Sequence, residues 1–190
     1  QNNDSTNYNV AIGSSAGAAI TSGVQNILVG ALAGDAITTG NSNVSVGHGS
    51  LSLNTASHRN TAIGEFALSA LNITTSTNAY NTALGYSAGA GVTTGVFNTL
   101  LGGLAGDALT DADFNVAIGS QALSADTRGS RSVAIGHSTL TTQNFTTATN
   151  VYNVAVGHGA GEAVTTGIRN TLVGGLAGIA LTDADFNVAL

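Results

Sequence analysis

The stretch Asn115-Val116-Ala117-Ile118-Gly119 decides how this chain folds, because versions of it recur along the whole sequence. Ten copies start with Asn and one with Ser, followed by a β-branched, a small or Leu, and an aliphatic residue, and Gly closes every copy except the last, which ends the sequence. The copies start at Asn9, Asn26, Asn43, Asn60, Asn81, Asn98, Asn115, Ser132, Asn153, Asn170 and Asn187. Successive starts are 17 positions apart, except that every fourth step is 21, so the pattern repeats every 72 positions. Such an internal repeat predicts a solenoid in which each copy builds one coil.

The motif also predicts which side chains face inward. The second position is β-branched and the fourth aliphatic in all eleven copies, and residues two apart on a strand share a face. We therefore expect these positions, for example Ile12, Val29, Val46 and Ile63, to line the interior of the coils. The third position then faces outward. It is small except for one leucine in each period, and we expect these leucines at contacts between subunits: Leu28, Leu100 and Leu172.

The remainder of each coil is expected to form a Gly corner, a second short strand and a polar turn such as Thr38-Thr39-Gly40. A single coil cannot bury its own apolar face, so coils must stack at the strand spacing of about 4.8 Å, with the asparagines forming a hydrogen-bonded ladder. The predicted fold is an all-β parallel β-solenoid, or β-roll. It forms one repetitive segment over residues 1–190, with super-repeats at 8–79 and 80–151 and an incomplete one at 152–190.

Composition excludes several classes of function. Charged residues make up 7% of the chain, against about a quarter in typical soluble domains. A net charge of −6 with only four arginines argues against nucleic acid as a partner. No apolar run approaches the roughly 20 residues that cross a bilayer, so this segment is not expected to insert into a membrane. The chain contains no Cys, which removes disulfides and thiolate metal sites.

The motifs Asn9-Val-Ala-Ile-Gly13, Asn60-Thr-Ala-Ile-Gly64 and Asn115-Val-Ala-Ile-Gly119 resemble the head repeats of YadA-type trimeric autotransporter adhesins. The resemblance covers nearly the whole chain, although the head coils of that family are shorter than the coils of this sequence. The longer repeat is also similar to tail-fibre proteins of marine bacteriophages. Both resemblances imply an extracellular homotrimer, on a bacterial surface or a virion, and the first implies left-handed parallel β-rolls.

Candidate sites are few. His48, His137 and His158 share the position after the motif Gly, where residue type varies freely, which favours a tolerant surface position over a metal site. Asp107, Asp111 and Asp113 bracket one turn but lack a complete calcium loop. No nucleophile, base and orienting group recur together, so no enzyme, cofactor or metal is expected.

The extra positions in every fourth coil offer a better candidate. They fall within 72–80 and 143–152, where aromatic rings stand among amides and hydroxyls. A loop of this composition can contact a glycan or protein receptor, or it can serve as a structural spacer. The candidate receptor contacts are Asn144, Phe145 and Tyr152.

Taken together, the repeat and the resemblance predict a structural and adhesive shaft or head of a trimeric fibre that attaches to a host or surface. Two other functions remain open on the sequence. Threonine-rich turns are found in ice-binding solenoids, and a tailspike that degrades polysaccharide would carry a pair of carboxylates in a groove between subunits.

Overall fold

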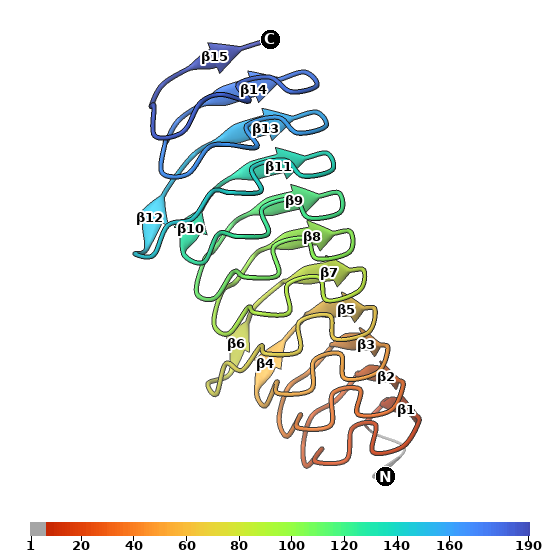
Figure 1. The fold of residues 1–190 in the computed structure, drawn as a ribbon. Helices are drawn as coiled ribbons and strands as arrows, with labels where there is room; N and C mark the ends of the chain where they lie inside the picture. The colour runs from red at the N-terminus through yellow and green to blue at the C-terminus, as the bar shows by residue number, and fades with distance from the viewer. Residues whose placement is uncertain (1–6) are drawn as a thin grey trace.

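A computed structural model describes residues 7–190 as a rod of about eleven stacked coils with no helix among them. The all-β parallel solenoid is confirmed. Figure 1 shows one coil above another from the N-terminal to the C-terminal end, with the main strands in a single column. That column is an eleven-stranded parallel sheet of β1 (Val10–Ile12), β2 (Ile27–Val29), β3 (Val44–Val46), β5 (Thr61–Ile63), β7 (Thr82–Leu84), β8 (Thr99–Leu101), β9 (Val116–Ile118), β11 (Val133–Ile135), β13 (Val154–Val156), β14 (Thr171–Val173) and β15 (Val188–Ala189).

Neighbouring strands pair motif to motif without a register slip. Ala11 of β1 lies opposite Leu28 of β2, which in turn lies opposite Ser45 of β3. Where the step between motifs is the longer one, the register still holds, because Ala62 of β5 lies opposite Ala83 of β7. The extra residues are therefore accommodated elsewhere in the coil, and like side chains stack along the rod.

The prediction of which strand face points inward is wrong. The third motif position is the buried one, and the leucines expected at subunit contacts are fully buried within the chain at Leu28, Leu100 and Leu172. The second and fourth positions face outward instead. Ile12 is 60% exposed and Ile63 is 36% exposed, while Val29 and Val46 are half-buried.

The asparagines explain this inversion. Residues one and three of a strand share a face, so the residue type at the first position decides where the third one points. The asparagine side chains lie inside the coil, where Asn43 donates from its backbone N to Oδ1 of Asn26 at 3.0 Å and from Nδ2 to the same oxygen at 3.1 Å. Asn43 also donates from Nδ2 to the carbonyl of Ser57 at 3.0 Å. The predicted asparagine ladder is confirmed, and it carries the third position into the interior with it.

The second half of each coil also differs from the prediction, since it forms consecutive turns rather than a second strand. In the coil of β8, Leu104 and Gly106 have φ values of 59° and 57°, which an extended strand cannot contain. Alternate N–H groups close turns and bridge coils: Ala105 donates to the carbonyl of Gly102, and Gly106 donates to the carbonyl of Ala122 in the next coil. The turns carry apolar residues such as Leu109 against the inner face of the sheet.

The longer coils add a short strand on the side away from the main sheet (Figure 1). There β6 (Thr77–Asn78) pairs in parallel with β4 (Ser57–His58), and β12 (Thr149–Asn150) pairs with β10 (Gly129–Ser130). The extra residues thus form a local two-stranded ledge that leaves the main stack undisturbed.

The motif glycines allow the coils to approach one another. Gly102 has φ of +133°, and a Cβ at this position would lie 2.6 Å from the carbonyl carbon and oxygen of Gly119. The adjacent Gly103 has no positive φ, and a Cβ there would meet nothing within 4 Å.

These neighbours make a matched test of the stacking. Gly102→Ala should lower the free energy of unfolding by about 2 kcal/mol or more, because it combines backbone strain with a backbone clash. Gly103→Ala should be neutral or slightly stabilising, since it only reduces the freedom of the unfolded chain. Urea unfolding followed by circular dichroism measures both, and equal effects of the two changes would contradict the close approach of coils.

Candidate functional site

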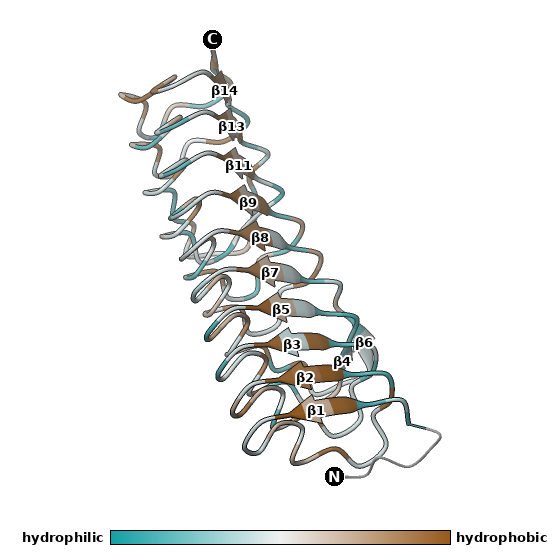
Figure 2. Ribbon diagram, turned by 90° about the vertical axis from the view of Figure 1, so that its right-hand side faces the viewer, coloured by the Kyte–Doolittle hydropathy of each residue, from teal (hydrophilic) through white to brown (hydrophobic). Residues whose placement is uncertain are grey.

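The outward side of the main sheet carries most of the exposed large hydrophobic residues of the rod. We call it the outer face: the second and fourth motif positions, the column just before each motif, and the column two residues after the motif Gly. Figure 2 shows strands β1 to β14 as a column of largely hydrophobic segments. The exposed large hydrophobic residues on it are Tyr8, Val10, Ile12, Ile27, Leu32, Ile63, Phe66, Tyr80, Leu84, Phe97, Phe114, Tyr152, Val173, Leu176, Phe186, Val188 and Leu190.

One edge of the outer face is a stack of aromatic rings and arginines, which the sequence analysis did not identify. It occupies the residue just before each motif, and this residue has φ of 51–66° in every coil. Tyr80 and Phe97 stack with ring centroids 5.5 Å apart, and Phe97 and Phe114 stack at 5.0 Å. Arginines extend the stack: Arg59 lies 5.6 Å from the Tyr80 ring, and Arg131 lies 4.9 Å from the Phe114 ring. The signal was available in the sequence, since three of the four arginines precede a motif.

The three candidate receptor contacts do not lie together as one exposed surface. Phe145 is only 8% exposed, which corrects its assignment as a receptor contact. Its N–H donates to Oδ1 of Asp126 at 3.0 Å, and its carbonyl accepts from the Thr127 hydroxyl at 2.8 Å. Asn144 is exposed next to it, and Tyr152 is exposed on the edge of the outer face near Arg131. The Phe145 side chain is therefore part of the packing.

The histidines and aspartates take part in local contacts. His137 and His158 are exposed and stack with ring centroids 5.3 Å apart, and His48 lies 3.7 Å from Glu65. Within residues 7–190, no group of three or more His, Cys, Asp or Glu side chains is placed to hold a metal ion.

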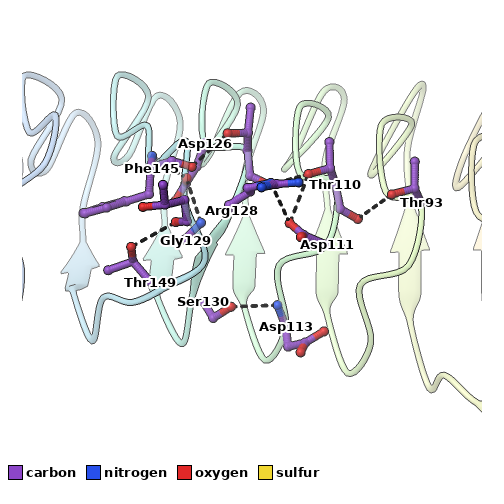
Figure 3. Close-up of polar contacts among 12 residues, drawn as sticks. Thr93, Thr110, Asp111, Asp113, Asp126, Arg128, Gly129, Ser130, Phe145 and Thr149 are labelled. Atoms are coloured by element: carbon purple, nitrogen blue, oxygen red, sulfur yellow. Dashed lines mark hydrogen bonds and ion pairs between the residues drawn. The ribbon is translucent and has the colours of Figure 1, made fainter.

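Asp111 and Asp113 are engaged in the turn that the sequence singled out. Asp111 forms an ion pair with Arg128 at 3.3 Å, and Asp113 accepts a hydrogen bond from the N–H of Val96 at 2.8 Å (Figure 3 draws both residues). Asp107 has one buried carboxylate oxygen with no hydrogen bond, and desolvation raises the pKa of this group.

The threonines of the polar turns form a column along the rod. Thr93 donates from its hydroxyl to the carbonyl of Thr110 at 3.2 Å, and Thr110 donates to the carbonyl of Thr127 at 3.0 Å (Figure 3). Each of these hydroxyl hydrogens is used to join two coils.

A buried polar network joins the second of the longer coils to the coil before it. Asp126 is fully buried and accepts N–H bonds at Oδ1 from Gly129 and Phe145, both at 3.0 Å (Figure 3). At Oδ2 it accepts from Nε2 of Gln143 at 2.6 Å, and the same Nε2 contacts Oγ of Ser132 at 3.1 Å. Desolvation raises the pKa of the Asp126 carboxyl, and the hydrogen bonds from Phe145, Gln143 and Gly129 oppose that shift.

This network repairs a break in the asparagine ladder. Ser132 stands where every other copy of the motif has Asn, and its side chain is too short to reach the next coil. Gln143 replaces the missing amide, because its Oε1 accepts from Nδ2 of Asn153 at 2.8 Å. Four positions of this network differ from the residues 72 positions earlier, where Asn54, Ser57, Asn60 and Leu71 stand in place of Asp126, Gly129, Ser132 and Gln143.

A second polar feature is an open hollow of ≈ 270 Å³ beside the first of the longer coils. It is lined by Asn41, Ser42, His58, Arg59, Ser76 and Asn78. Nδ1 of His58 accepts from the N–H of Asn41 at 2.8 Å, and its Nε2 lies 2.7 Å from Oγ of Ser76. Desolvation, with a smaller contribution from the charge of Arg59, lowers the pKa of His58 and favours the neutral ring.

Comparison of the chain with protein-family models, curated proteins and solved structures returned no significant match. In the part of the chain from residue 7 onward, no helix is both long enough and apolar enough to cross a membrane.

The Gln143 network makes a prediction on stability. Gln143→Leu should lower the free energy of unfolding by about 2 kcal/mol or more, because it removes one buried hydrogen bond from Oδ2 of Asp126 and one from Nδ2 of Asn153. The quadruple change Asp126→Asn, Gly129→Ser, Ser132→Asn and Gln143→Leu reproduces the residues found 72 positions earlier and should restore most of the loss. Denaturant unfolding of the single and quadruple variants tests this. A single variant as stable as the parent would refute the repair.

The Asp126 carboxyl also predicts a pH dependence. Its pKa is raised in the folded chain, so the unfolded chain loses this proton first as the pH rises. The contribution of the protonated Asp126 carboxyl to stability is therefore complete below the ordinary pKa of an Asp carboxyl. It is lost as the pH rises through the raised pKa of the folded chain. Relative to the quadruple variant, which lacks the carboxyl, the parent should become less stable over that interval. Unfolding curves across this pH range test the prediction. A difference in the free energy of unfolding between parent and variant that did not change with pH would contradict it.

Proposed function

We propose that this chain is a structural and adhesive segment of a trimeric extracellular fibre, a shaft or head on a bacterial surface or a virion. The observation that supports it is the outer face, which runs the length of the eleven-stranded sheet and carries exposed aliphatic and aromatic side chains. Its second and fourth motif positions hold no charged residue in any copy. Contiguous exposed apolar surface on this scale is typical of a protein interface.

The regularity of the outer face favours another copy of the same chain as the partner. Its side chains recur with the rise of the coils, so a surface that covers it along its length must repeat with the same rise. An identical rod laid alongside in parallel meets this condition at every coil, whereas a globular protein would match only a few coils. The three arginines lie at the edge, outside the aliphatic centre, where charged groups stay solvated.

Within such a fibre the ledges of the longer coils would be the accessible surface. The ledges formed by β4 with β6 and by β10 with β12 project from the side away from the main sheet. They would remain accessible when the outer faces are packed together, so contacts with a surface would recur along the fibre and add in strength.

The mass of the particle in solution tests the assembly. Light scattering coupled to gel filtration should give three times the chain mass, and Ile63→Asp with Leu84→Asp should weaken association by roughly tenfold or more, since it places charges in the apolar contact. Both side chains are exposed in the single chain, so each subunit should still fold.

Leu53 and Ile179 supply the control. They are 53% and 44% exposed but lie in the turn segments, off the outer face. Leu53→Asp with Ile179→Asp should leave the mass unchanged. A monomeric parent chain, or equal loss of association in both double variants, would contradict the proposal.

A further inference from the structure

The hollow beside the first longer coil has the chemistry of a binding site for an anion. Its amide oxygens are already engaged: Oδ1 of Asn41 accepts from the N–H of Val24 at 2.8 Å, and Oδ1 of Asn78 accepts from the guanidinium of Arg59. The Nδ2 groups of both asparagines have no hydrogen bond within residues 7–190. Their N–H donors therefore face the hollow unused.

The other lining groups add donors and one charge. Because Nδ1 of His58 is an acceptor, the neutral ring carries its proton on Nε2 and donates to Ser76, which leaves the Ser76 hydroxyl hydrogen free. Arg59 retains further N–H groups beyond the one that contacts Asn78. No carboxylate lines the hollow. A lining that is rich in donors, poor in acceptors and positively charged suits a ligand with a carboxylate and several oxygen acceptors.

The same arrangement recurs 72 positions further on with an aromatic ring against the arginine, and we call this the closed version. There Arg131 donates to Oδ1 of Asn150 at 3.1 Å, as Arg59 does to Asn78. Phe114 stands in place of Ser42, and its ring lies 4.9 Å from the Arg131 guanidinium, on which it stacks. Asp113 stands in place of Asn41 and brings a carboxylate (Figure 3).

The comparison indicates what the open site lacks. With Ser42 and Asn41 in place of Phe114 and Asp113, the first site lacks a ring beside the arginine and one negative charge. A ligand that fills the space of the ring and carries a carboxylate complements this site. The volume of ≈ 270 Å³ is near the lower end of small-molecule sites, about 300–1,000 Å³, which suits a single ring better than an extended chain segment.

We propose that this hollow binds a uronic-acid residue of an acidic polysaccharide. The carboxylate accepts hydrogen bonds from Arg59 and the Asn78 amide, the sugar hydroxyl oxygens accept from Asn41 and Ser76, and the pyranose ring occupies the space that Phe114 fills in the closed version. The net charge of −6 opposes any polyanion, so binding depends on the local charge of Arg59. The inference gives the adhesive part of the proposed function a ligand class and rests on it for its use; binding itself needs no assembly.

Calorimetric titration with trigalacturonate tests the site directly. The parent chain should bind with Kd of about 1 mM, as expected for contact with one small ring. Arg59→Gln should weaken binding about tenfold or more, because it removes the charged donor. Arg131→Gln, the matched change in the closed version, should leave the affinity unchanged. Equal effects of the two arginine changes, or none from Arg59→Gln, would overturn the assignment.

Closing the hollow provides the second arm. Ser42→Phe should abolish binding by placing a ring where Phe114 lies in the closed site, and Asn41→Asp should abolish it by adding a carboxylate, without added bulk. Circular dichroism verifies that each variant is folded. Asn41→Asp keeps the test decisive if Ser42→Phe does not fold, and unchanged binding in a folded variant of either kind would overturn the proposal.

Two further ligands separate the carboxylated sugar from its parts. Maltotriose, a neutral sugar, and inorganic sulfate should each bind at least tenfold more weakly than trigalacturonate. If maltotriose binds equally well, the charge has no role, and if sulfate does, the hollow is a general oxyanion site. Either result overturns the assignment to a uronic acid. A monomeric chain that still binds trigalacturonate would contradict the trimer and leave this inference intact.

Discussion

Parallel stacking of coils in exact motif register is the constraint on which this structure depends. No single coil has an interior of its own: its main strand is very short, and the partners of that strand all lie in the coils before and after. Two interactions hold the register. The asparagine ladder joins the start of each strand to the next inside the rod, and the motif glycines let successive corners approach to contact distance. Both demand the same residue at the same point of every coil.

The break in the ladder at Ser132 shows how strictly this demand is met. A missing amide inside the rod would leave donors of the next coil unsatisfied, at a cost comparable to a lost buried hydrogen bond. Gln143 reaches in from a longer coil to contact Asn153, and buried Asp126 accepts from Gln143 in turn. The substitution at one motif position is therefore accompanied by changes at three others, at Asp126, Gly129 and Gln143. As a consequence the Asp126 carboxyl is desolvated and its pKa is raised, so the stability of the rod at this point depends on pH.

The same constraint separates the rod into surfaces with different freedom. Interior positions must repeat, so they cannot adapt to a ligand. The aliphatic centre of the outer face repeats as well, which makes it suited to an equally regular partner such as a second copy. The ledges and the edge of the outer face, which is the column before each motif, carry side chains that stacking does not dictate. Here the two super-repeats differ, because Ser42 borders a hollow where Phe114 packs against Arg131. Variation of this kind is what a recognition site requires.

The sequence by itself determined the coil, its length, its register and the ladder, because these follow from residue types at a fixed period. It also contained the signal for the orientation of the strand, since Asn and the third residue share a face, but hydrophobicity at the second and fourth positions pointed the other way. Only the tertiary structure decided between the two orientations of the strand. The narrow interior holds the asparagine amides, which pair with their neighbours, together with the third-position side chains, which are small or leucine. The β-branched residues of the second position lie outside. The exposure of Phe145 was mispredicted for a related reason. A polar loop is expected to lie in solvent, and only the structure shows that this aromatic side chain packs beneath the ledge. The hollow at Arg59 could not be found from one stretch of sequence, since its walls come from three segments that meet only when the coils are stacked.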